Sequence, residues 1–204
     1  LSGAHSAAVR ADSGGTIGLT GGTVDKTGIN SLGLRADGEG SAIRTDGVDI
    51  TVTSRNAIGA QATNGGEIEL RGGKLSVSVE DVNARHESDG ALKAVGLGSR
   101  ISAFDLEIEV TGSEALNPGI SGGVRAQDGA ETSLDNVSIK TTGLTHGIRG
   151  INGGAKVTGN AIVETSGNGA VGVHAYGDAT VELTGGGILT SGDGSDGLFA
   201  EGAG

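Results

Sequence analysis

The feature that most constrains the fold is a repeat of about 25 residues that runs through the whole chain. Each copy contains a short motif: Gly or Ala, an apolar residue, any residue, and then a small residue, which is Ala in all copies but one. Successive motifs are 25, 26, 32, 32, 24, 25 and 25 residues apart. Self-similarity at this period is typical of solenoid proteins, in which each copy stacks on its neighbours. The apolar residues of the eight motifs are Val9, Leu34, Ala60, Leu92, Val124, Ile148, Val173 and Leu198.

Each copy holds three short segments in which apolar and polar residues alternate, such as GAQA, EIEL and KLSVSV in the third copy. This alternation predicts strands with one buried face. Asp-Gly, Asn-Gly and Gly-Gly pairs between the segments predict turns, because Gly and Asn tolerate positive φ. Three strands and three turns per copy predict a coil in which each strand pairs in parallel with its equivalent one turn later. We therefore expect an all-β chain: a single-stranded parallel β-helix (a β-solenoid) with about 25 residues and three short strands per rung.

Two columns of small residues accompany the repeat. The residue before the apolar position is always Gly or Ala, and the residue two after it is Ala in seven of the eight copies. Both columns predict places where only a small side chain fits. The chain has 42 glycines, two Phe, one Tyr and no Trp, Met or Cys. The interior must therefore be filled by stacked Val, Ile, Leu and Ala.

Composition also disfavours several classes of function. A formal net charge of -11 disfavours nucleic-acid binding, and the absence of an apolar run of 18 residues disfavours direct membrane insertion. The four histidines do not stand at metal-ligand spacing and there are no thiolates, so we expect no metal and no cofactor. With so few aromatic residues, a sugar-cleaving cleft like those of β-helix lyases and hydrolases is poorly equipped. We therefore predict no enzyme activity, and a polysaccharide-degrading β-helix enzyme is the less favoured reading.

The repeat motif, the Asn-Gly-Gly and Asp-Gly turns, and the closing segments IEVTG, IKTTG, VETSG and ILTSG resemble a known family. They are similar to the pertactin-like passenger domains of Gram-negative autotransporters, which use type V secretion. The resemblance covers the whole chain. It implies a right-handed β-helix that is displayed on the bacterial cell surface or secreted. It also implies that residues 1–204 are one β-helix segment of a longer passenger, whose signal peptide and C-terminal outer-membrane barrel lie elsewhere.

A basic column is the first candidate binding surface. The residue directly after the apolar position is basic in most copies, and alternation predicts that it faces outward. Stacked like charges repel, so either neighbouring acids such as Asp12, Asp37 and Asp128 pair with the column, or the column binds an anionic glycan or an acidic partner. Its candidate residues are Arg10, Arg35, Lys93, Arg125, Arg149 and His174.

Two longer corners are the second candidate surface. The copies of 32 residues carry their extra residues at the same corner on adjacent rungs, over 80–88 and 113–121. Solenoids place variable recognition loops at such corners, although neutral drift at a permissive corner explains them about as well. The candidate residues are Arg85, His86, Glu87, Leu116, Asn117 and Pro118.

A Thr/Ser column closes the third segment of the copies. Regular Thr arrays bind ice in some β-solenoids, but we favour hydroxyl groups that hydrogen-bond along the stack. The column consists of Thr27, Thr53, Thr111, Thr142, Ser166 and Ser191, with Glu80 as an interruption.

The function expected from these features is non-enzymatic adhesion: a surface-exposed virulence factor that binds a host protein or glycan. Capture of a host serum or complement factor is a close alternative. A structural alternative is a stalk that projects another region, or a module through which copies of the chain self-associate.

Overall fold

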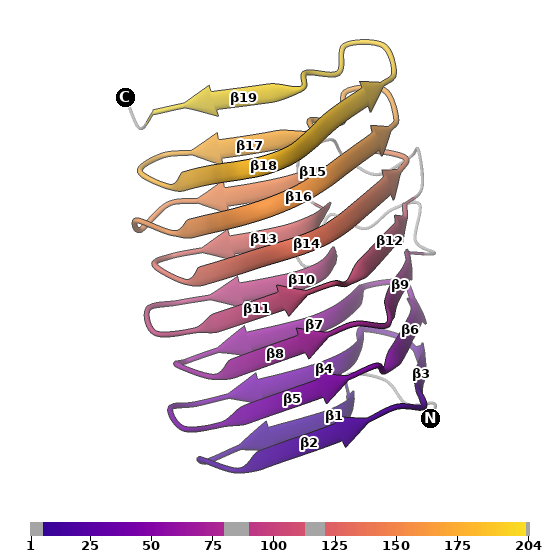
Figure 1. Cartoon of the computed structure of the whole chain (residues 1–204), viewed down its shortest axis with the longest axis vertical. Helices are drawn as coiled ribbons and strands as arrows, with labels where there is room; N and C mark the ends of the chain where they lie inside the picture. The colour runs from indigo at the N-terminus through magenta and orange to yellow at the C-terminus, as the bar shows by residue number, and fades with distance from the viewer. Residues whose placement is uncertain (1–5, 80–89, 113–120, 203–204) are drawn as a thin grey trace.

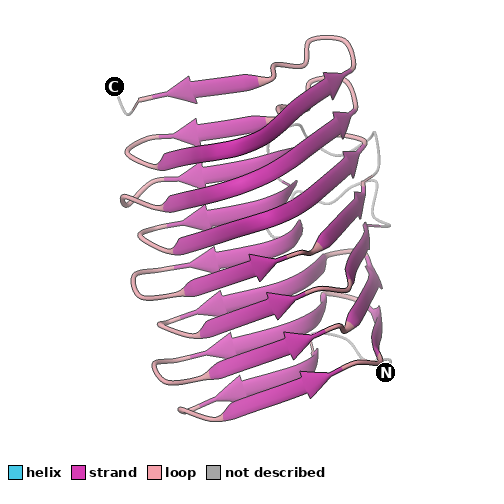
Figure 2. Cartoon of the chain, in the orientation of Figure 1, coloured by secondary structure: helices cyan, strands magenta, loops and turns pink. Residues whose placement is uncertain are grey.

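Strands and turns, without any helix, make up residues 6–79, 90–112 and 121–202, which are the residues described by the computed structural model (Figure 2). The strands stack rung upon rung from the N-terminus to the C-terminus (Figure 1). All of the strand pairs described are parallel. The parallel β-helix expected from the repeat is therefore confirmed.

The first strand of each rung joins an eight-stranded sheet, which lies behind the other strands in Figure 1. Its register aligns the repeat motifs, so that Leu34 pairs with Val9 on one side and with Ala60 on the other. In order, the strands are β1 (Ala7–Asp12), β4 (Ser31–Asp37), β7 (Ala57–Thr63), β10 (Gly90–Val95), β13 (Ser121–Gln127), β15 (Thr145–Ile151), β17 (Val173–Tyr176) and β19 (Leu198–Glu201).

The second and third strands of the rungs form the other walls. The second strands are β2 (Thr16–Thr20), β5 (Ala42–Asp46), β8 (Glu67–Arg71) and β11 (Arg100–Phe104). The third strands are β3 (Thr23–Gly28), β6 (Asp49–Ser54), β9 (Lys74–Val79) and β12 (Glu107–Thr111). Both series continue into β14 (Glu131–Thr142), whose first half pairs with β11 and whose second half pairs with β12.

The corner between the second and third strands disappears in the upper rungs, where the sequence predicted separate strands. There, β14, β16 (Lys156–Ser166) and β18 (Thr180–Ser191) run through the corner as single long strands (Figure 1). Lower rungs turn at glycines with positive φ, such as Gly21 and Gly22. In the upper rungs the register shifts at the corner, between Leu134 and Val137 and again beside Gly159. Such a bulge bends a strand without ending its pairing.

The interior is a column of aliphatic side chains, as the composition predicted. The repeat positions Leu34, Ala60, Leu92, Val124 and Ile148 are fully buried. The second and third strands supply the other two sides of the core. Their fully or almost fully buried residues include Ile43, Ile68, Ile101, Val157, Ile50, Leu75, Ile108, Ile139 and Val163.

Contacts with the next rung explain the Gly column of the motif. A Cβ on Gly59 would lie 2.7 Å from the carbonyl oxygen of Ala91 and 2.7 Å from Leu75 Cδ1. A Cβ on Gly123 would lie 2.9 Å from the carbonyl oxygen of Gly147. The first strand therefore approaches both the rung above and the third strand too closely for an ordinary side chain. The Ala column is also internal, since Ala36, Ala62, Ala94 and Ala126 are fully buried.

The Ala column gives a stability prediction. Ala126→Leu should lower the free energy of unfolding by about 1–3 kcal/mol, because added volume in a close-packed interior forces side chains and backbone to shift. Ser138→Leu on the same rung is the matched control, since Ser138 is exposed. Urea unfolding measures both variants. Equal stability of Ala126→Leu and wild type would show that this column does not point inward.

Candidate binding site on the eight-stranded sheet

The basic column is a real stack in the structure. Strand pairing places each member directly beside its equivalent on the next rung, on the outward side of the eight-stranded sheet. The stacked residues are Arg10, Arg35, Gln61, Lys93, Arg125, Arg149, His174 and Phe199.

In the lower part of the column the arginines pair with acids, which is one of the two interpretations drawn from the sequence. Arg10 forms an ion pair with Asp12, and Arg35 Nη2 lies 2.7 Å from Asp37 Oδ2. Asp37 Oδ1 also accepts hydrogen bonds from Asn64 Nδ2 at 2.8 Å and from Thr63 Oγ1 at 2.9 Å. The bonds from Asn64 and Thr63, together with Arg35, lower the pKa of Asp37. The negative charge of Asp37 is therefore already well stabilised by its own neighbours.

The upper part of the column differs in burial and in its neighbours. Arg125, Arg149 and His174 are only 5%, 9% and 8% exposed, although alternation predicted an outward-facing column. The flanking column, which supplies Asp12 and Asp37 below, supplies Gln127, Ile151 and Tyr176 here. Arg125 Nη2 donates a hydrogen bond to Gln127 Oε1 at 2.6 Å. Lys93, between the two parts, is half-buried.

A polar hollow of about 270 Å³ lies over these upper rungs. It joins residues from β13, β15, β17 and β19, so it exists only because four rungs stack in register. Cationic, amide, phenolic and carboxylate groups all face the same space. The lining residues are Arg125, Gln127, Arg149, Ile151, Asn152, His174, Tyr176 and Glu201.

His174 lies among the residues that line this hollow. Its ring centroid lies 5.1 Å from that of Phe199 and 6.3 Å from that of Tyr176. Neither ring nitrogen has a hydrogen-bond partner, and Nε2 lies 3.8 Å from Glu201 Oε1. Burial and the nearby charge of Arg149 lower the pKa of His174, while Glu201 opposes the shift. The imidazole is therefore neutral near pH 7, with one donor and one acceptor nitrogen that are both buried.

His146 was not among the residues singled out from the sequence. It lies beside His174, with ring centroids 5.8 Å apart. Its Nδ1 accepts a hydrogen bond of 2.7 Å from the backbone N–H of Val171. Burial, with smaller contributions from Arg149 and His174, lowers the pKa of His146 to about 3. His146 thus holds the next rung in place as a neutral side chain, a role that only the register of β15 reveals.

Two of the three aromatic residues of the chain gather at this hollow. Tyr176 lines it, and Phe199 packs on His174. The third, Phe104, lies on the other sheet under the guanidinium of Arg71, 4.1 Å from Arg71 Cζ. The sequence argument that aromatic residues are too few for a sugar site counted these residues, but it could not show that two of them lie beside the same histidine.

The corner-loop candidates lie outside the described residues. They are Arg85, His86, Glu87, Leu116, Asn117 and Pro118.

Charged residues on the other walls pair with one another across rungs. Glu67, Arg100, Glu131 and Lys156 stack as alternating charges, and Arg100 Nε lies 3.3 Å from Glu131 Oε2. Two further hollows of about 210 and 300 Å³ lie along this ladder. Because the ladder balances its own charges, we regard it as structural.

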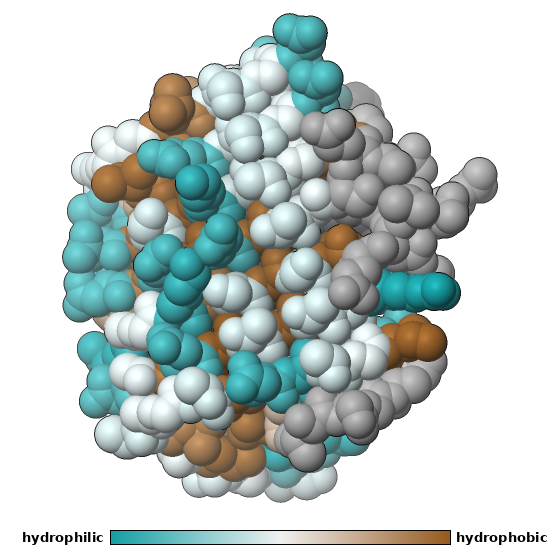
Figure 3. Space-filling model, turned by 90° about the vertical axis from the view of Figure 1, so that its right-hand side faces the viewer, coloured by the Kyte–Doolittle hydropathy of each residue, from teal (hydrophilic) through white to brown (hydrophobic). Residues whose placement is uncertain are grey.

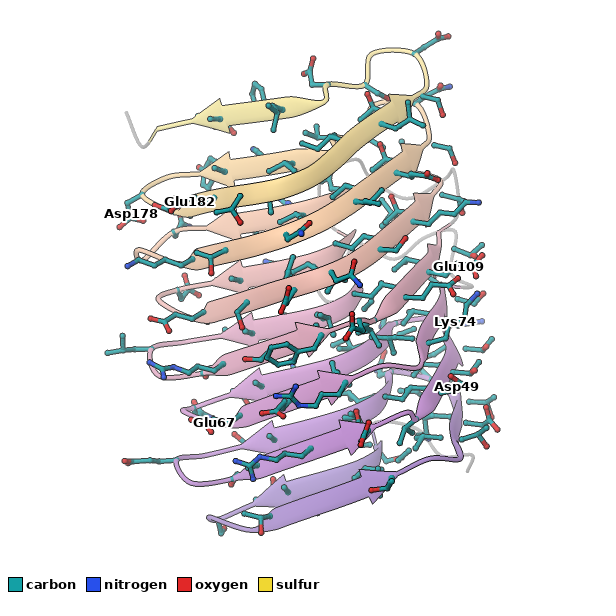
Figure 4. The ribbon with its side chains drawn as sticks, in the orientation of Figure 1. Asp49, Glu67, Lys74, Glu109, Asp178 and Glu182 are labelled. Atoms are coloured by element: carbon teal, nitrogen blue, oxygen red, sulfur yellow. The ribbon has the colours of Figure 1, made fainter. Side chains whose placement is uncertain are left out.

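Charged residues also pair across rungs on a second wall, the third-strand face. This face is the outward side of β3, β6, β9 and β12 and of the corresponding halves of β14, β16 and β18. Lys74 Nζ lies 2.8 Å from Glu109 Oε2 and 3.0 Å from Glu107 Oε1 (Figure 4). Hydrogen bonds to Glu109 and then Glu107 raise the pKa of Lys74, and Lys74 in turn lowers the pKa of Glu109.

The Thr/Ser column on this face is continuous. The register places Ser78, rather than Glu80, between Thr53 and Thr111. Among the seven residues of the column, which are all described, no hydrogen bond joins two hydroxyls; Ser191 Oγ donates instead to the carbonyl oxygen of Thr165 at 3.4 Å. The expected ladder of hydroxyl–hydroxyl bonds is therefore not present. A pale column beside teal, hydrophilic side chains marks this face in Figure 3.

Within the described ranges, no cluster of His, Asp or Glu could hold a metal ion. The same ranges contain no helix long and apolar enough to cross a membrane. No protein-family model matches the chain, and no curated protein or solved structure matches it either.

His146 gives a prediction about pH. Its folded pKa of about 3 lies below its ordinary value of 6.5, so only the unfolded state binds the proton between these values. The stability that neutral His146 contributes is complete above pH 6.5 and is lost as the pH falls, by about 1.4 kcal/mol per unit. His146→Asn keeps an acceptor for Val171 N–H without titrating. Between about pH 6.5 and about pH 5, wild type should lose roughly 2 kcal/mol more than this variant.

Urea unfolding at the two pH values measures this difference. Carboxylates titrate in both proteins, so their effect cancels in the comparison. Parallel pH curves for the wild type and His146→Asn would contradict a buried neutral His146.

Proposed function

We propose that this chain is a binding segment of an autotransporter passenger domain: a non-enzymatic adhesin that binds a host protein or glycan. In this proposal it is exposed on the bacterial surface or secreted. Its repeat motif and turn sequences support the family. The polar hollow on the eight-stranded sheet supports the activity, and it is the single observation on which the proposed activity rests.

The parallel stack makes this hollow a suitable binding site. Arg125, Arg149 and His174 stand on three consecutive rungs, so their positions follow the strand spacing of about 4.8 Å. Their backbones belong to paired strands rather than to loops. Groups held in this way lose little conformational freedom when a ligand binds, which favours affinity.

The lining of the hollow supports binding rather than hydrolysis. Most glycoside hydrolases use two carboxyl groups on either side of the scissile bond, about 5–9.5 Å apart. Among the described lining residues, Glu201 is the only carboxylate. Cationic and amide donors instead suit the stable recognition of an anionic or hydroxyl-rich ligand.

A display experiment tests this function. Beads coated with the chain should bind members of a panel of host glycans and serum proteins, the latter including complement factors. Arg125→Gln/Arg149→Gln should reduce that binding about tenfold or more, since charge-assisted hydrogen bonds contribute about 1.5–3 kcal/mol. Arg10→Gln/Arg35→Gln is the matched control in the lower part of the column, away from the residues that line the hollow, and should bind as wild type does. Circular dichroism and thermal unfolding confirm that each variant folds.

If the wild-type chain binds none of the glycans and serum proteins in the panel, the adhesin proposal is wrong. A stalk that projects another region is then the better description.

Self-association is a second candidate, and the third-strand face favours it. This face carries seven stacked hydroxyl residues that do not bond to one another, from Thr27 to Ser191. Beside them, Ile162 and Leu189 are 53% and 62% exposed. Exposed apolar side chains on a sheet face favour contact with another surface.

Sedimentation velocity over a range of concentrations tests this candidate. A self-associating chain should show a rising sedimentation coefficient that Leu189→Asp returns to the monomer value. A coefficient that stays monomeric at every concentration would exclude this face as a contact between copies.

A further inference from the structure

We infer that Asn152, one of the residues that line the hollow, is a site of spontaneous covalent modification, at which the side-chain amide is lost and aspartate or isoaspartate forms. The chain contains three Asn-Gly pairs, at 64–65, 152–153 and 168–169. Asn is a chemically labile residue, and a following Gly has no Cβ to obstruct an attack by its own nitrogen. The structure distinguishes the three pairs by the hydrogen bonds that hold the reacting groups.

The reaction needs only the chain and water. The backbone nitrogen of Gly153 bonds to Cγ of Asn152, the Cγ–Nδ2 bond breaks, and the amide nitrogen leaves as ammonia with the proton of the Gly153 N–H. Water then opens the cyclic imide at one of its two carbonyls, which gives aspartate or isoaspartate. The attack requires the nitrogen and Cγ to approach closely and in the right direction. Hydrogen bonds that hold either group away from this approach therefore slow the reaction.

At the pair 64–65, both reacting groups are held by neighbouring rungs. Asn64 Nδ2 donates a hydrogen bond of 2.8 Å to Asp37 Oδ1, and Gly65 N–H donates one of 3.1 Å to Ser99 Oγ. Ser99 Oγ in turn donates to the carbonyl oxygen of Val95 at 2.8 Å, which fixes the position of this hydroxyl. Attack at Asn64 must first break two hydrogen bonds.

The pair 168–169 is held by the corner of the next rung. Asn168 Oδ1 accepts a hydrogen bond of 2.9 Å from the backbone N–H of Asp193. Gly169 N–H donates one of 2.9 Å to the carbonyl oxygen of the same residue. The two reacting groups of this pair are therefore bonded as well.

Asn152 lies at the same corner of the coil as Asn64. Each residue directly follows a first strand, β15 or β7, and their φ angles are 51° and 54°. Within the part of the chain that the structure describes, however, neither the side chain of Asn152 nor the N–H of Gly153 forms a hydrogen bond. The bond that closes this turn runs from Ala155 N–H to the carbonyl oxygen of Asn152 at 3.0 Å and involves neither reacting group. Asn152 is also exposed to the water that the reaction consumes.

The flanking column on the rung below explains the difference at the amide. This position is Asp37 for Asn64 and Gln127 for Asn152. Asp37 has two carboxylate oxygens, so it accepts from the arginine beside it through Oδ2 and from Asn64 through Oδ1. Gln127 has a single side-chain oxygen, and this oxygen accepts from Arg125.

The length of the corner explains the difference at the attacking nitrogen. The corner at 152–155 is one residue longer than the corner at 64–66. The turn bonds run from Ala155 to Asn152 and from Gly66 to Thr63, so Gly153 is the second residue of its turn, whereas the glycine at 65 is the third. Only the third position brings the N–H to the serine of the rung above.

Conversion of Asn152 changes the charge of the hollow. Among the described lining residues, Glu201 is the one carboxylate, and either product at position 152 adds another. The conversion does not depend on whether the hollow binds a ligand, so its test and the display experiment succeed or fail separately.

Mass spectrometry of the whole chain, incubated at neutral pH and then digested, measures the conversion at each site as a gain of about 1 Da. Asn152 should convert at least about tenfold faster than Asn64 and Asn168, since two hydrogen bonds, each of which shifts an equilibrium several-fold, hold each slower site. Equal rates at the three sites, or no conversion at Asn152, would overturn the inference.

Incubation in urea separates the effect of the fold from that of the local sequence. The three rates should agree to within about threefold in the unfolded chain, because its backbone no longer holds any of the reacting groups. An order of rates that persists in urea would assign the difference to the flanking residues and would equally overturn the inference.

Two substitutions test the hydrogen bonds in opposite directions. Gln127→Asp supplies a second side-chain oxygen below Asn152 and should slow its conversion about threefold or more. Ser99→Ala removes the acceptor of the Gly65 N–H and should speed conversion of Asn64 about threefold or more, while Asn152 keeps its wild-type rate. Thermal unfolding confirms that each variant folds. If either folded variant leaves the rate at its own site unchanged, hydrogen bonds do not select the site and the inference is wrong.

Discussion

Parallel stacking in register is the constraint on which every other feature of this protein depends. Each residue lies about 4.8 Å from its equivalent on the next rung, so a side chain that fits once has to fit again beside a copy of itself. Inside the coil this leaves room for aliphatic columns and excludes side chains at Gly59 and Gly123, where a Cβ would meet the neighbouring rung. Outside it, a charge often faces a charge on the next copy, which explains the alternating ladder of Glu67, Arg100, Glu131 and Lys156.

The basic column is where that regularity breaks down, and the proposed site follows from the break. Asp12 and Asp37 offset the stacked arginines below, but the flanking position changes to Gln127, Ile151 and Tyr176 above. The same upper rungs bury a neutral histidine pair and place Tyr176 and Phe199 beside one of these histidines, His174. A surface that is structural at one end of the rod thus becomes chemically varied at the other, which is the property a recognition site needs.

Much of the fold and of the stacked columns could be predicted from the sequence, because the repeat shows which residues of successive rungs lie side by side. Once the motifs are aligned, the stacking of Arg10, Arg35, Arg125 and Arg149 follows, and so do the buried alanines. Predictions of which residues stack were wrong where a copy is longer than the others. Glu80 was counted into the hydroxyl column because the third copy is longer, and the register assigns that place to Ser78. The continuous strand β14 was missed because a bulge and a turn use similar residues.

The sequence by itself therefore determined the coil, its core and the order of its columns, since these depend on the repeat period, which can be seen in the sequence alone. Only the tertiary structure decided how deeply each outward residue is buried and what lies beside it. His146 looks like any other polar residue until Val171 N–H is seen to donate to it, and Arg149 looks exposed until its exposed fraction proves to be 9%. Contacts between rungs join residues about 25 positions apart, and their geometry depends on how side chains pack in three dimensions.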